Sequence, residues 1–187
     1  MFIGTLLIDL SKAFDCLPHA LLIAKLKAYN VSQNACAIIA SYLTSRLQRV
    51  KLGDIRSSWQ GTVKGIPQGS GLGPLLFNIF INDIFSSMKA CDLLNYADDC
   101  TLYTKDVNHE KVLNDLYVDA YNISEWFNAN YMEVNPSKFQ VMFLKPKRKK
   151  DPFPDTFDIF NISLPKSPSV KLLGVCIDQS LNFDEHV

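Results

Sequence analysis

The chain has 187 residues, with 19 Lys and Arg side chains against 19 Asp and Glu side chains, and 48% of its positions are hydrophobic. This length and composition predict one domain with a substantial apolar core, and the 12 Phe, 7 Tyr and 2 Trp exclude a mainly disordered chain. The zero net charge leaves nucleic-acid binding open, because a balanced total can hide a basic groove. No stretch of 18 residues is apolar throughout, which argues against a membrane protein.

Cysteine usage and one basic run bear on the protein's location. The five cysteines are odd in number and widely spaced, without a Cys-x-x-Cys pair. They therefore support neither a disulfide framework nor a zinc site, and we expect an intracellular protein of the nucleus or cytoplasm. Residues 145–150 are basic and precede Asp-Pro-Phe-Pro, so residues from about 145 to 156 are predicted to form a linker. A nuclear localisation signal is the alternative interpretation of this run.

The first half of the chain shows both strand and helix patterns. The apolar run at residues 6–8 has the length of a buried strand. Pro18 suits the first turn of a helix, and Ser32 can cap the helix that follows. Residues 50–52 and 58–63 are predicted to pair as a hairpin across Gly53 and Asp54. Residues 75–85 are apolar almost all round, which predicts a helix buried on most sides.

The second half repeats this mixture. Residues 93–94 and 101–103 are predicted strands joined by a tight turn, and residues 140–144, 158–164 and 170–177 are strand-like. Between them lies a long amphipathic helix with one apolar stripe, formed by Val112, Leu116, Ala120, Ile123 and Phe127. Together these patterns predict an α+β fold in which helices pack behind a small antiparallel sheet.

Three carboxylates lie in apolar surroundings. Asp9 ends the run at residues 6–8, and Asp98 and Asp99 lie between two predicted strands. Carboxylates at buried strand ends are unfavourable unless a cation neutralises them, and adjacent like charges strengthen this argument. Hard oxygen ligands favour Mg²⁺. The alternative interpretation is an exposed hairpin turn, where Asp-Asp pairs are common.

A glycine-rich loop at residues 65–74 leads into the predicted buried helix. It lacks the Gly-Lys-Ser/Thr of a Walker loop, and Pro74 stands where a dinucleotide fingerprint needs its last glycine. Glycines allow the backbone to approach a ligand closely, and Gln68 adds an amide. By itself, the loop could equally be a flexible lead into the helix.

In combination these segments resemble the palm of reverse transcriptases, and those of non-long-terminal-repeat retrotransposons in particular. Residues 135–138 resemble the fourth palm motif, and residues 172–178 resemble the hairpin that grips the primer end. The resemblance covers nearly the whole chain, and we expect residues 1–187 to form one partial palm domain. The three segments that carry it are Asp9-Leu-Ser-Lys-Ala-Phe-Asp15, Ile66-Pro-Gln-Gly-Ser-Gly-Leu-Gly-Pro-Leu-Leu-Phe77 and Tyr96-Ala-Asp-Asp99.

The resemblance implies a polymerase site that holds two Mg²⁺ ions, or Mn²⁺ in their place. Asp9 and Asp98 would bind both ions, the Leu10 carbonyl would be a backbone ligand, and Asp99 would complete the acidic cluster. Phe14 would be the steric gate against ribose, with a core aromatic as the alternative. Gln68 and Gly69 would lie against the incoming nucleotide and the template base. Lys138 would protonate the leaving pyrophosphate or pair with its charge.

The implied activity is RNA-directed DNA synthesis, with an RNA template, a DNA primer and dNTPs as partners. No segment of the sequence resembles the fingers or the thumb of these enzymes. We therefore expect an incomplete copy of a retroelement polymerase, with little processive activity by itself. The alternatives are a non-catalytic nucleic-acid-binding remnant and a protein-interaction module. Lys12, Arg46, Arg49 and Lys51 are candidate phosphate contacts, although scattered surface bases are usually only solvated.

Overall fold

The computed structural model describes residues 1–183 and divides the chain into two compact units. The sheet unit contains Met1–Ser11, Ile84–Ala129 and the chain from Val134 onward, and the helical unit contains Lys12–Asp83 and Asn130–Glu133. The last four residues of the predicted palm, 184–187, lie outside the described residues. In the described part of the chain, no helix is both long and apolar enough to cross a membrane.

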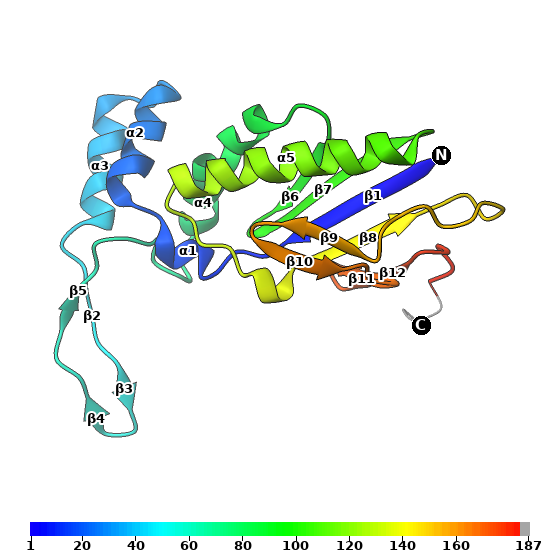
Figure 1. Ribbon diagram of the computed structural model, residues 1–187. Helices are drawn as coiled ribbons and strands as arrows, with labels where there is room; N and C mark the ends of the chain where they lie inside the picture. The colour runs from blue at the N-terminus through cyan, green and yellow to red at the C-terminus, as the bar shows by residue number, and fades with distance from the viewer. Residues whose placement is uncertain (184–187) are drawn as a thin grey trace. The chain divides into compact units, whose positions relative to one another are not determined.

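The sheet unit is built on a four-stranded antiparallel sheet in the order β6-β7-β1-β8 (Figure 1). Its central strand β1 alternates between buried and half-buried residues, so one face of the sheet points into the core. The strands are β1 (Phe2–Ile8), β6 (Asp92–Tyr96), β7 (Asp99–Asp106) and β8 (Gln140–Leu144). The α+β prediction is confirmed, including the turn between β6 and β7.

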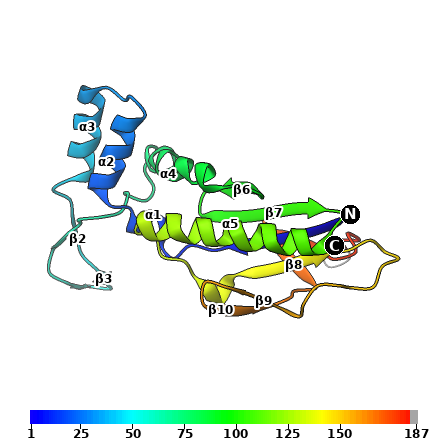
Figure 2. The same cartoon turned by 45° about the horizontal axis from the view of Figure 1, so that its top comes forward.

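Helix α5 (His109–Ala129) runs along the buried face of this sheet (Figures 1 and 2). Its predicted apolar stripe is confirmed, since all five of its residues are buried. A Cβ added at Gly4 of β1 would lie 2.6 Å from the Leu116 side chain and 2.8 Å from Val112. The missing side chain at Gly4 therefore lets the helix approach the sheet closely.

Two short hairpins complete the sheet unit. They are formed by β9 (Thr156–Ile159) with β10 (Ile162–Pro165), and by β11 (Ser169–Leu172) with β12 (Val175–Asp178). The prediction of one strand over residues 158–164 is wrong, because the chain reverses at Phe160 and Asn161, which both have positive φ. Residues 170–177 likewise turn at Leu173 and Gly174, as the resemblance to a primer-gripping hairpin implied.

The helical unit contains α1 (Ala13–Cys16), α2 (His19–Ala28), α3 (Gln33–Leu43) and α4 (Gly73–Ile81). Ser32 caps α3 as predicted, because its hydroxyl accepts a hydrogen bond from the Ala35 amide. The helix predicted at 75–85 is shorter than expected and gives way after Ile81 to the 3-10 helix η1 (Asn82–Ser87). Its predicted burial is wrong at Leu75 and Phe85, which are 54% and 47% exposed.

A long hairpin extends from the helical unit (Figure 1). It contains two short ladders, β2 (Leu47–Gln48) with β5 (Gln60–Gly61) and β3 (Lys51–Leu52) with β4 (Ile55–Arg56). The predicted turn at Gly53 and Asp54 is confirmed. The predicted pairing of residues 50–52 with 58–63 is wrong, because residues 51–52 pair with 55–56 and residues 60–61 pair with 47–48. Every residue from 44 to 61 is exposed, so the hairpin buries almost nothing within its own unit.

Candidate active site

Asp9 follows the last residue of β1, and its position is fixed by the backbone on both sides. The Asp9 carbonyl accepts a hydrogen bond of 2.9 Å from the Asn135 amide, and Leu10 forms a β-bridge with Val134. These contacts hold the end of β1 against the segment that leads into the 3-10 helix η2 (Pro136–Lys138). As a result, the Lys138 ammonium lies 3.3 Å from the Asp9 Oδ1 atom.

Asp98 and Asp99 reach the same end of the sheet through the turn between β6 and β7. The register pairs Ile8 of β1 with Cys100 of β7, so Asp99 lies at the sheet end where Asp9 emerges. Ala97 takes a positive φ of 51° in the tight turn that precedes Asp98. The sheet therefore brings together acidic residues that are about ninety positions apart in the sequence.

The charges of these carboxylates influence one another. Burial raises the pKa of Asp99 above its ordinary value, and repulsion from Asp98 and Asp9 raises it further, while Lys138 acts in the opposite direction. Burial and the same acidic surroundings raise the pKa of the neighbouring Cys100 thiol to about 12. The Cys100 thiol is thus kept protonated, so it is a poor nucleophile and a poor metal ligand.

The acidic cluster opens into a hollow of about 520 Å³, which we call the carboxylate groove. One wall is the exposed face of the sheet, a second comes from η2 and the start of β8, and a third comes from the β11–β12 hairpin. The fold thus brings three parts of the chain to one groove. They are the acidic cluster, the segment resembling the fourth palm motif and the hairpin resembling the primer grip. Its lining residues are Leu7, Ile8, Asp9, Asp99, Cys100, Thr101, Ser137, Lys138, Gln140, Lys171, Leu172, Leu173 and Gly174.

The donor chemistry of the cluster fits a hard divalent cation. The Asp9 Oδ2 atom is buried and has no hydrogen-bond partner among residues 1–183, which is unfavourable unless a cation completes its surroundings. Within that same part of the chain, no three His, Cys, Asp or Glu side chains are already arranged around a common point. The cluster therefore offers suitable oxygen ligands that would have to move closer together around an ion.

Repulsion in this cluster predicts that removing one charge stabilises the protein. An acid with a raised pKa binds its proton more tightly in the folded state, so Asp99 lowers stability once the pH exceeds its unfolded pKa. Asp99 is an exposed residue, so solvent screening weakens this effect. We expect Asp99→Asn to raise the Tm at pH 7.5 by about 1 °C, and by less as the pH falls towards about 4, where the unfolded carboxyl begins to take up its proton. Thermal unfolding followed by circular dichroism measures the change in Tm at each of these pH values. Asp158→Asn, at an exposed position on β9, is the control, and an equal gain from it would contradict the explanation.

The three other predicted site residues belong to the helical unit. The Phe14 ring is half-buried and stacks on Phe77, with ring centroids 4.5 Å apart. The Gln68 amide donates a 3.0 Å hydrogen bond to Asp15, and a Cβ added at Gly69 would meet nothing within 4 Å. Phe14 therefore has a packing role in this unit, while the loop at Gln68 and Gly69 is exposed.

The segments around Phe14 and Gln68 are tied together inside the helical unit. The Ile66 amide donates a 2.8 Å hydrogen bond to the Phe14 carbonyl. Gly65 has a φ of +88°, and a Cβ there would lie 2.8 Å from the Asp15 carbonyl oxygen. Glycine is thus required at residue 65 for the loop to pack against the segment that follows Asp9.

Lys171, an exposed lysine of β11, lines the carboxylate groove and was not predicted from the sequence. It directly precedes the segment resembling the primer grip, and that neighbourhood was the only available signal. The pairing of Lys138 with Asp9 was also not foreseen, because the two residues are 129 positions apart.

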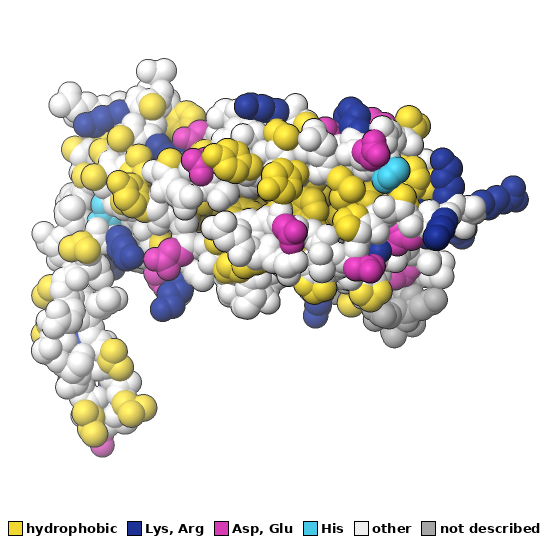
Figure 3. All heavy atoms as spheres, viewed as in Figure 1, with side chains coloured by type: hydrophobic (Ala, Val, Ile, Leu, Met, Phe, Trp, Pro, Cys, Tyr) yellow, Lys and Arg dark blue, Asp and Glu magenta, His cyan; other side chains and the backbone are white. Residues whose placement is uncertain are grey.

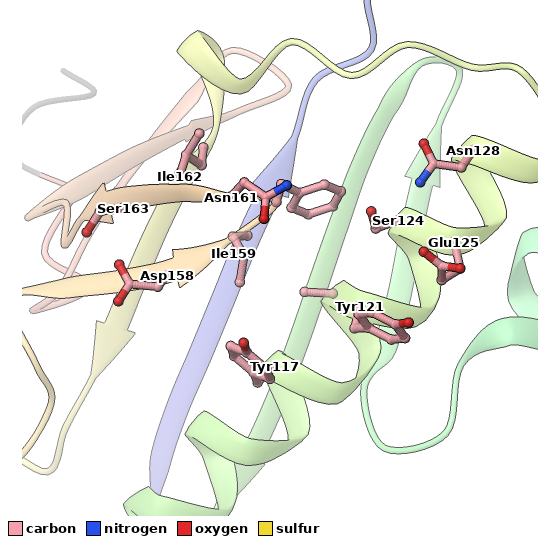
Figure 4. Close-up of a pocket in the computed structure, with 12 residues that line it drawn as sticks. Tyr117, Tyr121, Ser124, Glu125, Asn128, Asp158, Ile159, Asn161, Ile162 and Ser163 are labelled. Atoms are coloured by element: carbon pink, nitrogen blue, oxygen red, sulfur yellow. The ribbon is translucent and has the colours of Figure 1, made fainter.

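A second hollow of about 650 Å³ lies between α5 and the β9–β10 hairpin (Figure 4). Tyr117 and Tyr121 line it from the helix, and Asp158 and Asn161 line it from the hairpin. None of its lining residues belongs to the acidic cluster. It is therefore a separate feature of the sheet unit.

Comparisons with known proteins identify the family of this chain. Residues 4–177 match the family model described as reverse transcriptase (RNA-dependent DNA polymerase). The chain is 29% identical to a probable RNA-directed DNA polymerase from transposon X-element of Drosophila melanogaster, and the match covers 100% of the chain and 20% of that protein. It is also 29% identical to the RNA-directed DNA polymerase from mobile element jockey of Drosophila funebris, again over the whole chain and 21% of the relative.

Solved structures show the same fold. A telomerase from Candida tropicalis, in complex with a fragment of telomeric RNA, superimposes with a TM-score of 0.66 at 14% identity, covering 98% of the chain and 29% of the telomerase. The apo telomerase of the same organism, truncated from its C-terminal domain, gives a TM-score of 0.65 at 15% identity, covering 98% of the chain and 35% of the telomerase. The chain thus spans about a fifth of the curated relatives and about a third of these structures.

Proposed function

Because this chain belongs to the reverse transcriptase family, we propose that it forms the polymerase palm, residues 1–187, of an RNA-directed DNA polymerase of the non-long-terminal-repeat type. The reaction would be nucleotidyl transfer from a dNTP to the 3′-hydroxyl of a DNA primer paired with an RNA template. The observation that carries the proposal is the carboxylate groove, where Asp9, Asp99 and Lys138 lie beside the β11–β12 hairpin.

Asp9 and Asp98 would hold two Mg²⁺ ions, with the Leu10 carbonyl and Asp99 as further ligands. Such ions stabilise the negative charge that develops on the α-phosphate and on the attacking and leaving oxygens. The buried, unpaired Oδ2 atom of Asp9 supports this assignment, as does the raised pKa of Asp99, because both problems are relieved by a cation.

Lys138 is proposed to act on the leaving group. Its ammonium lies in the same groove as the carboxylates, and its side chain is 63% exposed, so it is free to turn from Asp9 towards a bound phosphate. An ammonium can pair with the charge of the leaving pyrophosphate or protonate it. The β11–β12 hairpin, with Lys171, would position the primer end over the exposed face of the sheet.

The test is primer extension on an RNA template with a DNA primer, dNTPs and Mg²⁺. The chain is joined for this purpose to the flanking regions of the X-element polymerase, because the relatives are about five times longer. We expect extension that stops when EDTA is added and returns with Mg²⁺ or Mn²⁺. Specific binding of primer–template without any extension would instead favour a non-catalytic nucleic-acid-binding protein.

Phe14 is proposed as the steric gate against a ribose 2′-hydroxyl. We expect Phe14→Val to raise the kcat/KM ratio of ribonucleotides to deoxynucleotides by about 10-fold or more, since removing the ring opens space beside the sugar. Single-nucleotide competition kinetics measures this ratio. The control is Phe77→Leu, which disturbs the same ring stack but leaves the Phe14 ring in place. Equal changes in both variants would show that Phe14 acts only through packing.

A further inference from the structure

The hairpin at residues 46–62 has two chemically different faces. The register pairs Lys51 with Arg56 and Leu52 with Ile55. Neighbouring pairs of an antiparallel hairpin point to opposite faces, so the two cations lie on one face and the two aliphatic residues on the other. Near the tip of the hairpin, the coloured side chains visible in Figure 3 are mainly hydrophobic.

The cationic face also carries an aromatic ring. The Arg49 guanidinium lies 4.3 Å from the centroid of the Trp59 ring, so both side chains occupy the same face. Arg49 lies between β2 and β3, where the Val50 carbonyl accepts a 3.0 Å hydrogen bond from the Ser57 amide and so continues the pairing of β3 with β4. Since Arg49 precedes Lys51 by two positions, alternation along this stretch puts it on the face of Lys51 and Arg56. We call Arg49, Lys51, Arg56 and Trp59 the basic face.

No described residue forms an ion pair with the basic face, and no residue of the helical unit covers it. No ion pair among residues 1–183 involves its three cations. The only acidic residue between positions 46 and 62 is Asp54 at the tip. Trp59 is 56% exposed, although a tryptophan normally buries most of its large surface.

These properties match the requirements of one ligand class. Single-stranded nucleic acid is held by cations that follow the phosphates and by aromatic rings on which bases stack, and an arginine beside the ring adds a cation–π contribution. A protein partner would favour the opposite face, where Val50, Leu52 and Ile55 are 72%, 78% and 76% exposed.

We propose that the basic face binds single-stranded nucleic acid, with one base stacked on Trp59 and neighbouring phosphates paired with Arg49, Lys51 and Arg56. This inference goes beyond the proposed catalytic function and does not depend on it, because binding is measured without extension. In an enzyme that copies a template, such a face would hold unpaired template strand.

The test is fluorescence anisotropy of labelled oligo(U) RNA and oligo(dT) DNA with the full 187-residue chain. We expect Trp59→Ala to weaken binding by about 10-fold or more, and Trp59→Phe to restore most of it. The triple variant Arg49→Gln/Lys51→Gln/Arg56→Gln should bind more weakly and lower the slope of log Kd against log salt by about 2 for single strands. We expect these variants to weaken the binding of oligo(U) and of oligo(dT) to a similar extent, because base stacking and phosphate contacts are common to RNA and DNA.

The control variant is Lys27→Gln/Lys147→Gln/Lys150→Gln, which removes the same charge from exposed lysines elsewhere. An equal loss of binding in this control would overturn the proposal, since net charge alone would then account for the interaction. Loss only in Leu52→Ser/Ile55→Ser would also overturn it and would identify the apolar face as the contact.

Tryptophan fluorescence provides a second readout in the Trp126→Phe background, where Trp59 is the remaining tryptophan of the two. Stacking of a base on Trp59 should quench its emission at the oligonucleotide concentration that saturates anisotropy. Unchanged emission at saturation would show that the ring does not contact the bases, and the proposed stacking would be wrong.

Discussion

Asp98→Asn is expected to lower the rate of RNA-templated primer extension by at least about 10²–10³-fold while leaving the protein folded. The amide has nearly the shape of the carboxylate but lacks the charge that anchors the ions. Asp98 lies in the turn between β6 and β7 and is only half-buried, so the substitution leaves the sheet register intact. Single-turnover extension by the chain joined to its relatives' flanking regions gives the rate.

The matched control for this prediction is Asp158→Asn, which removes one carboxylate from an exposed position on β9. We expect it to extend primers at the parent rate. If Asp98→Asn also extends primers near the parent rate, Asp98 is not a metal ligand in this polymerase.

Asp119→Ala should produce the largest loss of stability among single carboxylate replacements in the sheet unit. The Asp119 carboxylate is fully buried and accepts hydrogen bonds from the amides of Lys89, Ala90 and Cys91, with a fourth from the Asn122 side chain. Alanine would leave three backbone donors without partners, at a cost of about 1–3 kcal/mol for each that stays dry. We expect a net loss of about 3 kcal/mol, measured by urea unfolding.

The pH dependence gives this second prediction its control. Burial tends to raise the pKa of Asp119, but the three backbone donors and Asn122 outweigh it and leave the pKa below its ordinary value. An acid with a depressed folded pKa stabilises the protein above its unfolded pKa, and this contribution disappears as the pH falls through the folded pKa. The difference between parent and Asp119→Ala should therefore shrink below about pH 4. If the difference in unfolding free energy stays constant as the pH falls, Asp119→Ala destabilises the protein through lost packing and not through lost charge.

Local pattern was sufficient to predict most elements of the sheet unit. The apolar run before Asp9, the stripe of α5 and the acidic turn between two strands were each visible in a few neighbouring residues. The segments containing Asp9 and Asp98-Asp99, together with the segment resembling the fourth palm motif, also implied that Asp9, Asp99 and Lys138 share one site. Asp9, Asp99 and Lys138 do line one groove, although their catalytic roles stay predictions.

The features that the sequence did not reveal depend on long-range contacts or unusual turns. Phe160 and Asn161 carry the reversal between β9 and β10 without a glycine, so Asn161 was the single, weak turn signal within the strand pattern. The two faces of the hairpin at residues 46–62 could not be predicted without its strand register. That register puts Arg56 opposite Lys51, and the Arg49 side chain lies over the Trp59 ring. Burial of Asp119 likewise depends on a loop that lies about thirty positions away.

We propose that the acidic cluster at the end of β1 and β7 holds divalent metal ions. Titration with Mn²⁺ tests it directly, because a bound paramagnetic ion broadens the NMR signals of nearby amides. We predict selective broadening at residues 8–10 and 97–101 and at Lys138, reversed by excess Mg²⁺ and absent from Asp9→Asn/Asp98→Asn. Broadening that is uniform over the exposed carboxylates, or unchanged in the double variant, would contradict the assignment of this cluster as the metal site.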